Sequence, residues 1–256
     1  MGSGKMKIWI VIITAVLLPQ TLLAADHPAT LQWSQRVELS TPVSGVIQVV
    51  NVEVGDLVKK GQVLLILDST AYRAKVAGDQ SQITRLKAEA DEAKRNLDRV
   101  QELYERTVVA TTELDQVRLH ALKSQSMLAE AKARLRQNQK ALDDTVLRAP
   151  FDAVVVLRQA EPGKSVVTGL QPQMLLTLAK SGEMIARMKL SSPQIDKLKN
   201  GQTVIVNISG RKYSGKIKTL GLEPINISDE SVYLVDVVFS STEILRAGAP
   251  ASLQLP

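Results

Sequence analysis

The sequence contains no cysteine among its 256 residues. This absence excludes disulfide bonds, thiolate metal sites, cysteine nucleophiles and a lipidated N-terminal cysteine. The two histidines, His27 and His120, stand alone, and no catalytic-triad order, phosphate-binding loop or zinc-ligand spacing occurs. We therefore expect no metal site, no cofactor and no enzymatic activity.

Aromatic residues are also scarce, with two Trp, two Phe and four Tyr. A surface that stacks successive bases of a single strand needs more of them. The formal net charge of +6 is mild for 256 residues and is typical of a solvated surface with a small basic excess. The sequence therefore predicts no nucleic-acid partner.

Long apolar runs are missing except at the N-terminus. Lys5 and Lys7 precede the apolar run from Ile8 to Leu18, and small residues Ala24 and Ala25 follow. This is the layout of a secretory signal peptide over residues 1–25, with cleavage near Ala25. The run of 11 residues is shorter than the ~20 that a membrane-spanning helix needs. The alternative is an N-terminus that is kept as an uncleaved anchor.

Residues 37–69 have the pattern of short strands. Val, Ile and Leu dominate, partly alternating with polar residues, as half-buried sheets prefer. Turn residues interrupt the pattern at Gly45, at Gly55 with Asp56, and at Gly61. Glycine accepts a positive φ there and Asp can hydrogen-bond the local backbone, so several tight turns are predicted.

Residues 71–145 contain no proline and a single glycine, Gly78. Apolar residues recur at alternating spacings of three and four in the first half, at Ile83, Leu86, Ala90, Ala93, Leu97, Val100 and Tyr104. In the second half they recur every seven residues, at Leu114, Ala121, Leu128, Leu135 and Leu142. Both patterns are a/d seams of a coiled coil.

A break rich in β-branched residues at 106–112 separates the two seams. The sequence therefore predicts an antiparallel coiled-coil hairpin over residues 71–145, whose second helix Thr111 or Thr112 can cap. The alternative is a pair of helices packed on a globular body, which would drift toward a period of 3.6 residues.

A repeat flanks this hairpin. Gly55 follows Pro42 by thirteen residues, and Gly163 follows Pro150 by thirteen residues. Each unit ends in an apolar run, at 63–67 in the first and 174–178 in the second. We therefore expect one small β domain built from residues 37–70 plus 146–180, with the hairpin inserted between its two halves.

The tail at 181–256 consists of short strand patterns with glycine turns, which favour a small antiparallel β-barrel. Residues 26–36 are left as a short N-terminal segment. The predicted fold class is thus α+β.

In this order, the parts resemble the periplasmic adaptors, HlyD-like membrane fusion proteins of tripartite efflux and secretion systems. The resemblance rests on the split lipoyl-like halves, the inserted hairpin and tail motifs at 198–204 and 213–217. It implies a barrel-sandwich hybrid domain and location in the periplasm. It also implies three partners: an inner-membrane transporter, an outer-membrane channel and further copies in a homo-oligomer, a hexamer in the assembly. The transporter is expected to be of the resistance-nodulation-division type, with an ABC-type transporter as the other possibility.

The resemblance also implies that the hairpin tip contacts the channel. Adaptors of the resistance-nodulation-division type carry an Arg, a Leu four residues later and a Ser seven residues after that. Arg99 and Leu103 fit this pattern, whereas the third position is Ala110. The alternative for Arg99 and Leu103 is an ordinary solvated flank and seam edge. The expected channel-contacting residues are Arg99, Leu103, Val108, Val109, Ala110, Thr111, Thr112 and Glu113.

Two other functions stay open from the sequence. A lipoyl or biotinyl carrier subunit would need a modifiable lysine at residues 69–71, where Ser69, Thr70 and Ala71 stand. A periplasmic coiled-coil scaffold would need no partner at the tip.

Many adaptors have a further, membrane-proximal domain built from the two ends of the chain. The short stretches before Val37 and after the barrel predict that this domain is absent or vestigial here.

Overall fold

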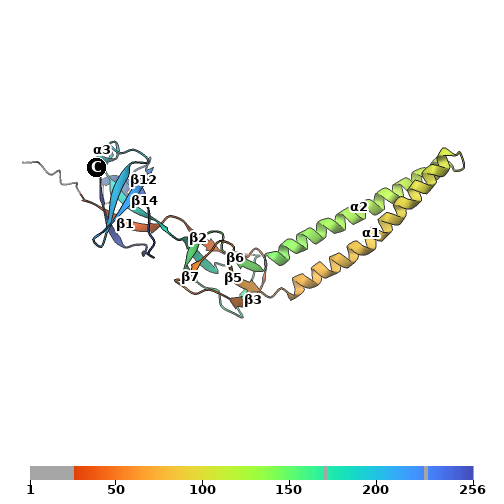
Figure 1. Ribbon diagram of the computed structural model, residues 1–256, viewed down its shortest axis with the longest axis horizontal. Coiled ribbons are helices and arrows are strands. Elements are labelled where there is room, and N and C mark those ends of the chain that lie inside the picture. The colour runs from red at the N-terminus through yellow and green to blue at the C-terminus, as the bar shows by residue number, and fades with distance from the viewer. Residues whose placement is uncertain (1–25, 170–171, 228–229, 256) are drawn as a thin grey trace, which may run out of the picture. The chain divides into compact units, whose positions relative to one another are not determined.

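The computed structural model describes residues 26–169, 172–227 and 230–255, so the predicted signal peptide lies outside the described residues. It divides into two compact units. One contains a β domain and a long helical hairpin, and the other contains most of a β-barrel (Figure 1). Within the described ranges, every helix is too short or too polar to cross a membrane.

The β domain consists of two four-stranded sheets, with strand orders β2-β9-β7-β4 and β6-β5-β3-β8. Each sheet combines two strands from before the hairpin with two from after it, which confirms the predicted split domain. The strands are β2 (Arg36–Leu39), β3 (Gly45–Val50), β4 (Leu57–Val58), β5 (Val63–Leu67), β6 (Val146–Arg148), β7 (Ala153–Arg158), β8 (Ser165–Val166) and β9 (Leu176–Lys180).

The sequence repeat corresponds to a pseudo-two-fold relation between the two halves. The Gly55 N–H donates to the Val155 carbonyl, and the Gly163 N–H donates to the Ile47 carbonyl, both at 2.8 Å. These are equivalent bonds, because each residue of the second half follows its counterpart by 108 positions (55 to 163, 47 to 155). The pairing of β3 with β8 is likewise equivalent to the pairing of β7 with β4. The domain is therefore closed by exchange between its halves.

The core of this domain is aliphatic, and β5 shows why its sequence does not alternate. Leu64, Leu65 and Leu67 are all fully buried. The register between β5 and β6 shifts between Val63 and Leu65, and such a bulge turns two successive side chains toward one side. Leu176 and Leu178 of β9 belong to the same buried cluster. Burial of aliphatic side chains thus ties the strands from before and after the hairpin into one core.

The hairpin consists of α1 (Thr70–Glu105, 36 residues) and α2 (Thr111–Asp143, 33 residues), which lie side by side in Figure 1. At ~1.5 Å per residue α1 is about 54 Å long. The predicted seam residues close the contact, with Leu86 and Ala90 of α1 clustered with Leu128 and Ala131 of α2. The apolar residues that recur every three and four positions therefore form the interface between the helices, as the heptad pattern predicted.

One polar pair interrupts this seam. Asp79 of α1 is only 8% exposed, and its Oδ2 accepts a hydrogen bond of 2.6 Å from Nδ2 of Asn138 on α2. A buried polar pair of this kind holds the two helices in one register, because sliding either helix would leave both groups unpaired.

At the start of the first helix, the side chain of Asp68 and not that of Ser69 accepts the hydrogen bonds. Ser69 stands at the N-cap and is buried, but its hydroxyl makes no capping bond. Asp68 Oδ1 accepts from the Thr70 N–H at 2.9 Å and from the Thr70 hydroxyl at 2.7 Å. These bonds, the backbone one first, hold the pKa of Asp68 below its ordinary value of 3.8.

The barrel unit has the sheet order β10-β1-β15-β11-β12-β14-β13, and a pairing of β10 with β14 closes six of these strands. The predicted antiparallel barrel is thereby confirmed. The strands are β1 (Asp26–Trp33), β10 (Glu183–Leu190), β11 (Thr203–Ile208), β12 (Arg211–Leu220), β13 (Ile225–Ile227), β14 (Glu230–Ser240) and β15 (Pro250–Gln254), with a short helix α3 (Ser192–Ile195) after β10.

The N-terminal segment differs from expectation. The sequence predicts a separate segment over residues 26–36, whereas in the structure β1 is a barrel strand that pairs antiparallel with β15, Asp26 opposite Gln254. This pairing joins residues more than 200 positions apart, so no local sequence pattern predicts it.

The barrel also holds a bidentate ion pair, in which Arg187 Nε and Nη2 donate to Asp236 at 2.6 and 2.8 Å. The Asp236 bond is the main cause that raises the pKa of Arg187.

Candidate partner-binding site at the hairpin tip

The tip of the hairpin is built on a tight helix ending. The Thr107 N–H donates to the Tyr104 carbonyl at 2.9 Å, and the Val108 N–H donates to the Leu103 carbonyl at 3.0 Å. This bond pair is the Schellman motif, which requires a left-handed residue just after the helix. Thr107 supplies it with a φ of 62°. The chain therefore reverses direction within residues 106–110.

A threonine in this conformation is strained. The left-handed region brings Cβ close to the following carbonyl oxygen, at a cost of roughly 1–2 kcal/mol, and a β-branched side chain is an outlier there. Glycine is the usual residue at this position. Strained backbone of this kind is concentrated at functional sites, which makes the tip a candidate site.

The second helix begins without a side-chain cap. Ala110 is the N-cap residue, with an extended backbone and no side chain that can accept a hydrogen bond. The expectation that Thr111 or Thr112 caps α2 is therefore wrong, because both already lie inside the first turn. The Thr111 hydroxyl instead makes a long contact of 3.4 Å with the Tyr104 hydroxyl. Glu113 lies in the first turn, where it suits the positive end of the helix dipole.

The predicted tip residues differ in accessibility. Val108 is 66% exposed, whereas Val109 and Leu103 are half-buried. Below them, Val100 and Leu114 are buried and close the seam. The remaining predicted residues, Arg99, Ala110, Thr111, Thr112 and Glu113, are exposed.

The charged side chains next to the tip are held on their own helix. Arg99 Nη2 donates to Asn96 Oδ1 at 2.8 Å, one turn earlier. Arg106 forms an ion pair with Glu102. The structure thus brings together an exposed valine and small and hydroxyl side chains, with Arg99 about two turns below them. This surface can contact another helical tip but has no catalytic arrangement.

The predicted turn residues of the β domain lie apart from this site and have structural roles. Gly55, Gly61 and Gly163 have φ values of 98°, 84° and 87°, so each turn requires a left-handed backbone. Asp56 Oδ2 accepts from the Glu53 N–H at 2.8 Å and stabilises the first of these turns. Gly45 differs, because it lies in β3, where an added Cβ would meet the Leu67 side chain at 3.4 Å.

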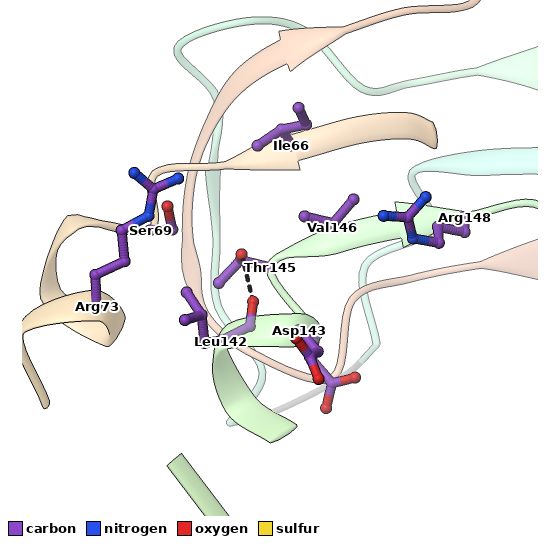
Figure 2. A pocket seen from close by; sticks show the side chains of 9 residues that line it. Ile66, Ser69, Arg73, Leu142, Asp143, Thr145, Val146 and Arg148 are labelled. Atoms are coloured by element: carbon purple, nitrogen blue, oxygen red, sulfur yellow. Dashed lines mark hydrogen bonds between the residues drawn. The ribbon is translucent and has the colours of Figure 1, made fainter. Parts of the chain in front are cut away.

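The root of the hairpin contains an open pocket of about 620 Å³ (Figure 2). Its lining has charges of both signs, with Arg73 and Arg148 beside Asp143 and Asp144. The Thr145 hydroxyl donates to the Leu142 carbonyl at 2.7 Å and ends α2 there. On the other side of the root, residues 69–71, where a carrier subunit would present its lysine, lead into α1. Within the described residues, no three His, Asp or Glu side chains gather as a metal site would need.

Sequence reasoning missed one exposed apolar feature of the hairpin. Leu119 and Leu122 of α2 are 66% and 64% exposed, although both are large aliphatic side chains. They stand outside the a/d seam, three residues apart, and that spacing was a signal available in the sequence.

Comparison with known proteins identifies the family. Residues 35–180, more than half of the chain, match the model of the CzcB-like, barrel-sandwich hybrid domain. A macrolide export protein MacA of Escherichia coli O157:H7 is 24% identical over 90% of this chain and 69% of its own length. A macrolide export protein MacA of Yersinia pestis is 28% identical over 84% of this chain and 62% of its own length.

Solved structures show the same fold. The structure of a membrane fusion protein of Streptococcus pneumoniae R6 superposes with a TM-score of 0.71 and 16% identity, covering 91% of this chain and 98% of that one. Family members are adaptor proteins rather than enzymes, which agrees with the expected lack of catalysis. The split β domain, the inserted hairpin and the family match together make this chain a member of the membrane fusion protein family, the periplasmic adaptors, with a CzcB-like barrel-sandwich hybrid domain.

Proposed function

We propose that the protein is the adaptor of a tripartite export system and bridges an inner-membrane transporter to an outer-membrane channel in the periplasm. The observation that carries this proposal is the inserted hairpin, about 54 Å of two-helix rod whose tip exposes Val108. A rod that is stiff along a packed seam and exposes a valine at its end is suited to span a distance and to meet a partner there.

The transporter is proposed to be of the ABC type. The sequence alone favoured a transporter of the resistance-nodulation-division type. Relatives that align over most of this chain are named macrolide export proteins, and this group favours an ATP-driven partner. The departure at Ala110 from the tip pattern of resistance-nodulation-division adaptors points the same way.

The adaptor is proposed to work as a ring of copies, six in the assembly. Short strands β4 and β8 end the two sheets of the β domain, and apolar side chains are exposed at both edges. Val54 and Leu57 are 60% and 61% exposed at the β4 edge, and Val167 is 55% exposed just after β8. Exposed apolar edges of sheets are liable to pair with another chain, so a second copy is the expected cover.

A photoreactive amino acid at Val108 tests the function in cells. We expect ultraviolet light to link this position to an outer-membrane channel protein. The matched control is Lys87, an exposed residue on α1 about 27 Å from the end of that helix, where no channel should be captured. An abundant, correctly exported protein that captures no outer-membrane protein from Val108 would refute the proposal.

A further inference from the structure

The hairpin and the β domain have separate hydrophobic cores. The buried cluster of the hairpin consists of Leu86, Ala90, Leu128 and Ala131, with Ile83 packed against them. The buried cluster of the β domain contains only residues of its own strands and loops, so no described residue belongs to both. Burial of apolar area fixes two parts relative to each other only where they share it. The angle between the hairpin and the β domain is therefore set by something other than a common core.

The chain connects the two parts through two short links. Asp68 and Ser69 join β5 to α1, and Asp144 and Thr145 join α2 to β6. The open pocket of about 620 Å³ at the root lies beside both links, because residues of each link line it (Figure 2). Hinges in proteins are formed by a few such residues at the ends of elements. The packing thus leaves room for the hairpin to pivot on its links as a rigid rod.

One side chain of the hairpin restrains this pivot. The Tyr72 hydroxyl donates to the Ser44 carbonyl, just before β3, at 2.7 Å. The Lys75 ammonium lies over the Tyr72 ring, 5.9 Å from its centre, and favours this position of the ring. Among the residues that the structure describes, no other side chain of α1 or α2 makes a hydrogen bond or an ion pair with the β domain beyond the two links.

Ser44 is held in turn by the segment that follows β8. Its Oγ accepts from the Thr168 N–H at 3.1 Å and lies 3.0 Å from Thr168 Oγ1, a second hydrogen bond. The next residue, Gly45, pairs with Val166 of β8. The Ser44 carbonyl that Tyr72 uses is therefore positioned by Thr168. A chain of hydrogen bonds leads from α1 through Ser44 to the β8 edge of the β domain.

We propose that Tyr72, Ser44 and Thr168 form a latch that sets the angle of the hairpin on the β domain. The latch is made within one chain and does not depend on what the hairpin tip contacts. The length of the rod amplifies any change at the root, because a tilt of about 10° over about 54 Å moves the tip by about 9 Å. Loss of one hydrogen bond at the latch thus changes where the tip stands.

Two spin labels can report the hairpin angle, because the chain has no cysteine of its own. Lys60→Cys places one label on the β domain, and Lys94→Cys places the other about 36 Å along α1. Both lysine side chains are exposed and form no ion pair in the described part of the chain. Double electron–electron resonance on the purified full chain gives the distribution of distances between the labels, and we expect one narrow peak.

Tyr72→Phe removes the hydroxyl of the latch and keeps the ring. It should raise the population outside the main peak about two- to fivefold, which is the effect of one hydrogen bond of modest net strength on an equilibrium. Ser44→Ala removes both bonds to Thr168 at an exposed position and should broaden the distribution in the same way. The double variant should be no broader than Tyr72→Phe alone, because both changes break one latch. Tyr104→Phe, the same substitution at the far end of α1, is the matched control and should have no effect.

The outcomes decide between the latch and a passive connection. An unchanged distribution in Tyr72→Phe, at the helix content of the parent protein by circular dichroism, would overturn the proposal. Broadening in Tyr72→Phe without broadening in Ser44→Ala would overturn the part of Ser44 and Thr168. Equal broadening in Tyr104→Phe would mean general loosening of the hairpin and would also overturn the latch. Channel capture at Val108 is measured separately, so the latch and the proposed function fail independently.

Discussion

Replacing Asn138 with leucine should destabilise the hairpin, because it leaves the Asp79 carboxylate buried without its partner. Asp79 is 8% exposed, and the bond from Asn138 Nδ2, at 2.6 Å, is its only hydrogen bond to another side chain in the described structure. Hydrogen bonds to charged groups contribute about 1.5–3 kcal/mol, and a buried acceptor left unpaired loses at least that much. We therefore expect Asn138→Leu to lower the free energy of unfolding by about 2 kcal/mol.

The double variant Asp79→Leu/Asn138→Leu should recover this loss, because two apolar residues of similar size can replace a polar pair at little cost. Unfolding in denaturant, followed by circular dichroism, gives the coupling energy of the pair through a double-mutant cycle. Ser124→Leu is the control, since Ser124 occupies the equivalent seam position and is half-buried without a side-chain partner across the seam. A coupling energy below about 0.5 kcal/mol would refute the reasoning.

Three further predictions follow from single residues. Thr107→Gly should raise the free energy of unfolding by up to about 1 kcal/mol in denaturant melts, because it relieves the left-handed strain while adding some chain entropy; a loss of stability would contradict the strain argument. Gly55→Ala and Gly163→Ala should destabilise by similar amounts, about 1–2 kcal/mol each, because the two turns are equivalent, and markedly different melting temperatures would contradict the pseudo-symmetry. Asp68→Asn should reduce stability near neutral pH but not in acid, because the folded pKa of Asp68 lies below 3.8 and its contribution disappears as the pH falls through that folded value; an equal loss at pH 2 and pH 7 would contradict this role.

The sequence repeat anticipated the β domain in unusual detail. Gly55 and Gly163, each thirteen residues after a proline, indicated a repeat and one β domain built from two halves, and the structure shows equivalent hydrogen bonds from both glycines. The heptads likewise predicted the seam, because a seven-residue apolar period is compatible with few other structures. These features are local in the chain, so their physical meaning can be understood without knowledge of distant contacts.

Features that depend on distant contacts were harder to predict. Residues 26–33 gave no sign that they complete the barrel, since their pairing partner lies at 250–254. The prediction that Thr111 or Thr112 caps α2 failed for a local reason, because the tight turn places the N-cap at Ala110. Leu119 and Leu122 were not predicted as a feature, because the heptad pattern describes the seam and both residues lie outside it.

The most direct test of the bridging function is to ask whether one adaptor molecule joins proteins of both membranes. Cells would be cross-linked, and the tagged adaptor purified under denaturing conditions and examined by mass spectrometry. We expect an inner-membrane transporter and an outer-membrane channel to be recovered together, with the channel lost in a Val108→Asp variant whose ring still forms. Recovery of proteins from only one membrane, or from neither, would contradict the account.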